Sequence, residues 1–100
     1  MPMHVISEKA LRTFWMKHPR AEIGLRAWAV TMRRNVFMDF TDLKGVFGSA
    51  DYVAPYTVFD IGGNNFRLIA VVHYAVRKVY ARHVFTHTGY DRWTKAMQKG

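Results

Sequence analysis

The 100-residue chain contains no cysteine, so neither a disulfide framework nor a thiolate metal site can form in it. It also has no long hydrophobic run, because its longest wholly apolar stretch covers only residues 68–72. A membrane-spanning helix needs about 20 such residues. The first residues do not combine a basic stretch with an apolar run, so we expect no signal peptide. These absences predict a soluble cytoplasmic protein with no membrane partner.

Acidic side chains are also scarce. The chain has 15 Lys and Arg against seven Asp and Glu, a net charge of +8. Residues 67–100 hold seven basic residues and one acid, whereas residues 1–66 have a net charge of only +2. A one-sided positive field attracts polyanions such as nucleic acids. At this point a surface chosen for solubility and a patch that docks an acidic protein remain open alternatives.

The length suits a single domain, residues 1–100, with one modest core, and half of the residues are apolar. A short strand is predicted over residues 3–6. Ser7 follows, and its hydroxyl is expected to accept a hydrogen bond from the first turn of a helix. Apolar residues at helical spacing carry this helix to about Lys17.

The pair His18-Pro19 interrupts the helical pattern, because a residue that precedes proline avoids helical backbone angles. Pro19 can itself open a second helix, which is predicted to end near residues 33–35. Two helices separated by so short a break predict an antiparallel helical hairpin.

The second half of the chain reads as strands. A turn or short helical piece at residues 41–45 and a loop at residues 48–51 come first. Three strands are predicted, over residues 56–61, 66–74 and 78–86. The Gly-Gly-Asn-Asn sequence at residues 62–65 is typical of a hairpin turn. A short helix over residues 91–98 ends an α+β fold, with an antiparallel sheet and the helix pair packed on one of its faces.

Alternation of side chains assigns residues to the two faces of the sheet. In strand 66–74 the even-numbered residues form an apolar face, and Arg67 lies on the other face. In strand 78–86 the odd-numbered residues are the more apolar, which predicts that His83 is packed in the core and that Arg82 points outward. If both apolar faces meet the helices, the two arginines share the opposite face.

The segment at residues 82–91 carries side chains suited to cutting RNA. Without a metal, cleavage needs a base for the 2′-OH, an acid for the leaving 5′-oxygen and cations for the phosphate. Arg67 and Arg82 suit the phosphate, because arginine binds phosphate oxygens in pairs and keeps its charge. His87 can accept or donate a proton. Tyr90 can orient the substrate, and it would need cationic neighbours to act as a base.

Each of these residues has a structural alternative. Arg67 could cover apolar surface with its stem while its charge meets water. His87 could bond a backbone carbonyl, and Tyr90 could anchor the last helix. Lys44, on a predicted loop, carries no assignment from spacing alone.

A metal site is not expected from the histidines. Four residues of strand would separate His83 from His87 by about 13 Å, which is too far to chelate one ion. No carboxylate stands at ligand spacing with these two or with His73. We therefore expect neither a metal nor a cofactor.

With these residues the chain resembles the HigB family of bacterial toxins, the mRNA-cutting members of the RelE-like superfamily. The matching segments are residues 10–19, the pair Leu43-Lys44, the hairpin at 58–69, and the closing motif at 79–82, 86–87 and 90–91. The long hairpin and the Thr-His-x-x-Tyr-Asp ending together make the resemblance specific. The family usually has an apolar residue where His83 stands.

The resemblance implies a RelE-like fold and a toxin that cleaves mRNA, either free or on the ribosome. It implies silencing by a HigA-like helix-turn-helix antitoxin, through which alone the complex would bind operator DNA. The positions that it singles out are Lys44, Arg67, Arg82, His87 and Tyr90. We expect His87 to carry protons, the arginines to hold the phosphate, Lys44 to be a supporting cation, and Tyr90 to orient the RNA or transfer a proton.

The expected products are a cyclic 2′,3′-phosphate and a 5′-hydroxyl. Five further cations are expected to attract RNA in general: Arg77, Lys78, Arg92, Lys95 and Lys99. The main alternative is a non-catalytic basic module that holds RNA or DNA. Clustering of His87 and Tyr90 with arginines favours the enzyme, because a pure binder would more naturally show several exposed aromatic residues for stacking. A subunit that only docks an acidic partner is the third hypothesis.

Overall fold

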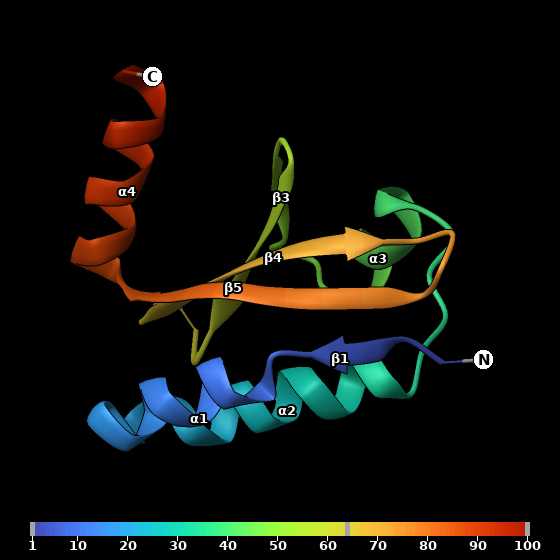
Figure 1. Ribbon diagram of the computed structural model, residues 1–100, viewed down its shortest axis with the longest axis horizontal. Coiled ribbons are helices and arrows are strands. Elements are labelled where there is room, and N and C mark those ends of the chain that lie inside the picture. Colours follow the sequence, from blue (N-terminus) through green and yellow to red (C-terminus); the bar gives the residue numbers. More distant parts are fainter. Residues whose placement is uncertain (1, 64, 100) are drawn as a thin grey trace.

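The computed structural model describes residues 2–63 and 65–99, with side chains up to residue 97. Asn64 of the predicted hairpin turn and the side chain of Lys99 therefore lie outside the described residues. In chain order the elements are β1 His4–Ile6, α1 Glu8–Lys17, the 3₁₀ turn η1 Pro19–Ala21, α2 Glu22–Arg33, α3 Phe40–Val46, β2 Asp51–Val53, β3 Tyr56–Ile61, β4 Phe66–His73, β5 Lys78–Thr86 and α4 His87–Lys99 (Figure 1).

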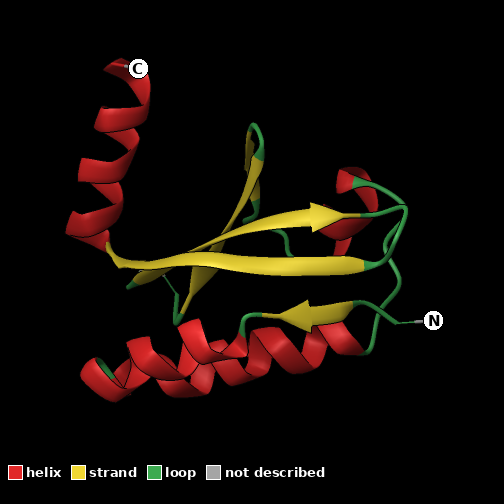
Figure 2. Cartoon of the chain, in the orientation of Figure 1, coloured by secondary structure: helices red, strands yellow, loops and turns green. Residues whose placement is uncertain are grey.

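The five strands form one mixed sheet in the order β1-β5-β4-β3-β2 (Figure 2). Neighbouring strands are antiparallel except for β1, which runs parallel to β5 with Val5 opposite Val79. The predicted α+β class is confirmed, whereas the prediction of an antiparallel sheet is wrong at β1. A three-residue strand has too little pattern of its own to reveal which edge it joins or in which direction.

Helices α1 and α2 lie side by side along one side of the sheet (Figure 1). Glu8 near the start of α1 forms an ion pair with Arg33 at the end of α2. Near the other end of the pair, the guanidinium of Arg26 stacks 4.8 Å from the ring centre of Trp15. The helices therefore run in opposite directions. Within the described part of the chain, no helix is long and apolar enough to cross a lipid bilayer.

The main core lies between these two helices and the face of the sheet that we call the core face. The helices contribute buried apolar side chains that include Leu11, Leu25, Trp28 and Met32, and the strands contribute Phe59, Ile61, Leu68, Ala70, Val79 and Ala81. Each large side chain of this kind stabilises the fold by about 1.5–3 kcal/mol.

Two shorter elements and one helix start differ from the sequence predictions. The residues expected to be a loop at 48–51 run into strand β2, which pairs with β3. Helix α3 replaces the expected turn or helical piece, and Asp39 caps it by accepting a hydrogen bond from the Asp42 amide. The predicted cap at Ser7 is wrong: Ser7 has a left-handed backbone, with φ of 71°, and makes no side-chain cap bond.

A β-bulge at Arg82 interrupts the pairing of β4 with β5. Ala70 lies opposite Ala81, but Ile69 lies opposite His83, so that Arg82 is an extra residue. The extra residue reverses the alternation along β5. His83 is consequently exposed rather than packed in the core, and the prediction made from alternation is wrong for this residue.

Candidate active site

Arg67 is the centre of a compact cluster on the face of the sheet opposite the core face, which we call the outer face. Its Nε donates to Asp60 Oδ1 on the neighbouring strand β3 over 3.0 Å. Its guanidinium carbon lies 5.6 Å from the ring centre of Tyr90 on α4. The side chains of Arg67 and Asp60 are only 13% and 24% exposed. These three residues, the Arg67 cluster, hold a fixed positive charge where helix α4 meets the sheet.

Helix α4 begins at His87, four residues earlier than the sequence predicted. Thr86 caps the helix, because its hydroxyl oxygen accepts a hydrogen bond from the Gly89 amide over 3.2 Å. His87 and Tyr90 therefore lie three residues apart in the first helical turn. Residues at this spacing share one side of a helix, so the early start places both near the Arg67 cluster.

His87 is exposed and faces its own helix on one side. Its Nε2 lies 3.8 Å from Asp91 Oδ2, which is too long for a hydrogen bond, and the two side chains are 62% and 56% exposed. The imidazole is therefore open to solvent and to a ligand. An accessible imidazole beside a fixed guanidinium can exchange protons with a bound phosphate ester.

A group of aromatic rings holds α4 against the outer face. Trp93 packs against Tyr56 at 5.4 Å, Phe85 at 5.9 Å, Tyr90 at 6.0 Å and His83 at 6.4 Å, measured between ring centres. Each such aromatic pair contributes about 0.5–1.5 kcal/mol beyond burial of area. The position of Tyr90 over Arg67 thus depends on the docking of the whole helix.

Beneath this helix, Val58 and Ile69 are 3% and 0% exposed, although both belong to the outer face. They lie opposite each other, and Ile69 also lies opposite His83. Rings that surround Trp93 flank these positions on both sides. The outer face thus has a small apolar centre of its own, which the helix covers.

Sequence reasoning missed Asp60 and Trp93. The signal for Asp60 was present, because a turn at residues 62–65 sets Asp60 opposite Arg67 across the hairpin. No comparable signal existed for Trp93. Its role depends on where the last helix folds back, which the strand pattern does not determine.

Arg82 is not joined to the Arg67 cluster. It is exposed at the bulge, and its guanidinium carbon lies 5.4 Å from the ring centre of Tyr80. Arg67 lies opposite Phe85, three residues further along β5. The prediction that alternation alone puts both arginines on one face is wrong in its reasoning, because the bulge interrupts the alternation at Arg82.

Lys44 lies on α3, and Figure 1 shows α3 and α4 at opposite ends of the long axis of the molecule. Its Nζ donates to the carbonyl oxygens of Ala50 at 2.7 Å and Gly48 at 3.3 Å. The structure therefore does not bring Lys44 to the Arg67 cluster. In this position the ammonium group fastens α3 to the segment that leads into β2.

The additional basic residues fall into two separate groups. Arg92 and Lys95 are exposed on α4, close to the cluster. Arg77 and Lys78 lie at the turn between β4 and β5, at the far end of β5 from α4. Only the first pair flanks the candidate site. Within the described residues there is no group of three His, Asp or Glu side chains that could hold a metal ion.

The fold and the site define a small α+β protein with a fixed cation and an accessible histidine on one face of its sheet. Residues 21–93 match the model of the HigB toxin family, described as the RelE-like toxic component of a toxin–antitoxin system. The chain belongs to this family. An antitoxin is therefore its partner.

Curated relatives support this assignment over nearly the whole chain. The chain is 38% identical over 95 residues to the mRNA interferase toxin HigB of Escherichia coli K12, and the match covers 92% of this chain and 91% of that protein. The mRNA interferase HigB of Escherichia coli O157:H7 matches to the same extent. The mRNA interferase HigB of Escherichia coli CFT073 is 26% identical over 96 residues, which cover 93% of each chain.

Proposed function

We propose that this protein is an endoribonuclease that cleaves mRNA and thereby inhibits translation, as the toxin of a type II toxin–antitoxin pair. The observation that carries the proposal is the Arg67 cluster beside the first turn of α4, which holds a guanidinium next to the exposed imidazole of His87. The names of the relatives, which are mRNA interferases, support the same activity.

In the proposed reaction a base removes the proton of the 2′-OH, and the 2′-oxygen attacks the adjacent phosphorus. The bond from phosphorus to the 5′-oxygen breaks, and an acid returns a proton to that oxygen. His87 is the proton carrier, and Arg67 stabilises the charge that develops on the phosphate. Asp60 orients Arg67, and Tyr90 positions the RNA or takes part in proton transfer. The products are a cyclic 2′,3′-phosphate and a 5′-hydroxyl.

The other predicted site residues have less direct roles in this proposal. Arg82 contacts a phosphate near the scissile one, from the bulge beside the cluster. Arg92 and Lys95 add general attraction for RNA from the surface of α4. The role of supporting cation for Lys44 has the least geometric support, because its ammonium group already binds two carbonyl oxygens at the other end of the molecule.

The partners follow from the proposed activity. The antitoxin is a HigA-like helix-turn-helix protein, and operator DNA is bound through the antitoxin alone. The toxin acts in the cytoplasm on mRNA, either free or on the ribosome. In this proposal the pair α1–α2 is the N-terminal helical hairpin of a RelE-like fold.

The test incubates purified protein with mRNA in EDTA, with and without ribosomes, and maps the ends of the fragments. We expect cleavage that leaves cyclic 2′,3′-phosphate ends and that His87→Ala greatly slows. Intact RNA under both conditions, together with salt-dependent binding, would replace the proposal by a non-catalytic RNA-binding module. Cleavage at undiminished rates by both His87→Ala and Arg67→Ala would move the active site elsewhere.

A further inference from the structure

A second surface, beside the candidate active site, lies between α1 and β5. Strand β1 covers the edge of β5 only as far as Tyr80, opposite Ile6. Beyond that point α1 lies beside the strand edge and leaves an open groove of about 520 Å³. The floor of the groove is apolar and includes Phe14 and Phe85.

The charge of this groove is entirely of one sign. Lys9 and Lys17, two turns apart on α1, line one wall, and Arg82 lines the other, with no carboxylate among the lining residues. Within the described part of the chain none of these three cations forms an ion pair. Their charges are therefore available to an anion.

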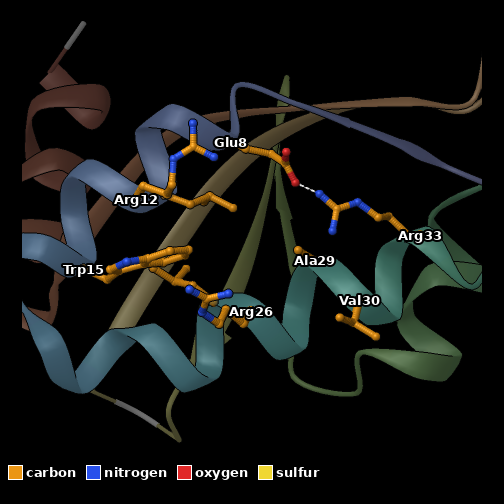
Figure 3. Close-up of a pocket in the computed structure, with 9 residues that line it drawn as sticks. Glu8, Arg12, Trp15, Arg26, Ala29, Val30 and Arg33 are labelled. Atoms are coloured by element: carbon orange, nitrogen blue, oxygen red, sulfur yellow. Dashed lines mark ion pairs between the residues drawn. The ribbon is translucent and has the colours of Figure 1, made fainter.

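A pocket on the other side of α1 provides the contrast (Figure 3). This pocket, of about 190 Å³ between α1 and α2, also contains arginines. However, Arg33 pairs with Glu8, and Arg26 pairs with Glu22 over 2.7 Å while it stacks on Trp15. The positive charge there is largely neutralised by the protein itself. The two sides of one helix thus differ in what they offer to a polyanion.

The groove also offers a surface for stacking. His83 and Phe85 both line it, and their rings stack with centres 5.4 Å apart and planes at 17°. The bulge at Arg82 is what turns His83 toward this side, where it is exposed. Flat exposed rings beside cations are the combination with which proteins hold single-stranded RNA.

The groove is continuous with the candidate active site. Phe85, at the rim of the groove, lies directly opposite Arg67 in the sheet. We propose that this groove binds the single-stranded RNA that flanks the scissile phosphate: Lys9, Lys17 and Arg82 contact phosphates, and a base stacks on His83. This inference rests on the proposed function, and it assigns a binding role to α1 and to His83.

The test measures the affinity of each variant for a short fluorescent single-stranded 2′-O-methyl RNA, which this reaction cannot cleave, over a range of salt concentrations. We expect Lys9→Glu and Lys17→Glu each to weaken binding and to lower the slope of log affinity against log salt by about 0.7, the contribution of one phosphate contact. Arg12→Glu, the same charge reversal on the opposite side of α1, is the matched control and should change both quantities much less.

The stacking contact is tested separately at His83. We expect His83→Ala to weaken binding about fivefold or more, and His83→Phe to restore most of the affinity, because stacking tolerates exchange of one ring for another. In cleavage assays with unmodified RNA, the His83→Ala defect should appear mainly in KM. A loss of affinity in His83→Phe equal to that in His83→Ala would contradict stacking.

Other results would overturn the groove. They include absence of RNA binding by the parent protein, equal losses in Arg12→Glu and Lys9→Glu, and unchanged RNA affinity in groove variants that no longer copurify with the antitoxin. The last result would make the groove a protein-docking surface. Failure of the parent protein to cleave RNA would refute the proposed function, whereas the binding assay reports on the groove without any cleavage.

Discussion

Arg67 on β4 and Tyr90 on α4 lie against each other, with the guanidinium carbon 5.6 Å from the ring centre. A cation over an aromatic face contributes about 0.5–1 kcal/mol at an exposed site and more where water is excluded. The contact joins the sheet to the helix that carries His87. The proposed catalytic groups are therefore in place only when α4 is docked.

The ion pair between Asp60 and Arg67 should control the orientation of the arginine. We expect Arg67→Lys to lower the rate of RNA cleavage about 100-fold, because lysine cannot hold a phosphate and a carboxylate in one fixed plane. Asp60→Asn should cost about tenfold, since it removes only the group that orients Arg67. Cleavage rates at saturating RNA measure both effects. A rate for Asp60→Asn equal to that of the parent would show that this ion pair does not position Arg67.

Removal of His87 should abolish most of the activity without unfolding the protein. General acid–base catalysis contributes about 10²–10⁴-fold, and His87→Ala should lose a factor in this range. The matched control is His73→Ala, an exposed histidine at the far end of β4 that packs on Tyr80. Single-turnover cleavage compares the two, and equal rates for both variants would remove His87 from the mechanism.

Lys44 should matter for stability more than for cleavage. Lys44→Met removes both hydrogen bonds from Nζ to the carbonyls of Gly48 and Ala50. We expect a loss of about 1 kcal/mol in the free energy of unfolding, measured with urea, and a cleavage rate within about twofold of the parent. A large fall in rate with unchanged stability would instead support the supporting-cation role that the family resemblance implies.

Gly24 on α2 marks a close approach between helix and sheet. A Cβ at this position would lie 2.7 Å from Ile61 Cγ2 and 3.0 Å from the amide nitrogen of Gly62. We expect Gly24→Ala to destabilise the protein by about 1–3 kcal/mol. Gly45→Ala on α3 is the control, because nothing lies within 4 Å of its Cβ. Thermal unfolding of both variants tests the prediction, and a stable Gly24→Ala protein would contradict this packing.

Local pattern was sufficient for the elements that have one. The predicted strands at 56–61 and 78–86 coincide with β3 and β5, and the predicted first helix ends at the residue where α1 ends. Alternating β-branched and aromatic residues, and a proline break, are encoded within a few neighbouring residues. The same reasoning missed β2 and began α4 too late, because a three-residue strand and a capping threonine are weak signals.

The sequence by itself determined the class of fold, the family, and the residue types that suit RNA chemistry. Tertiary structure alone decided which of these residues meet. A one-residue bulge at Arg82 turned His83 out of the core, and the docking of Trp93 placed Tyr90 over Arg67. Lys44 was left at the other end of the molecule. Register and helix docking depend on contacts between distant segments, and a short-range pattern of residues carries no record of them.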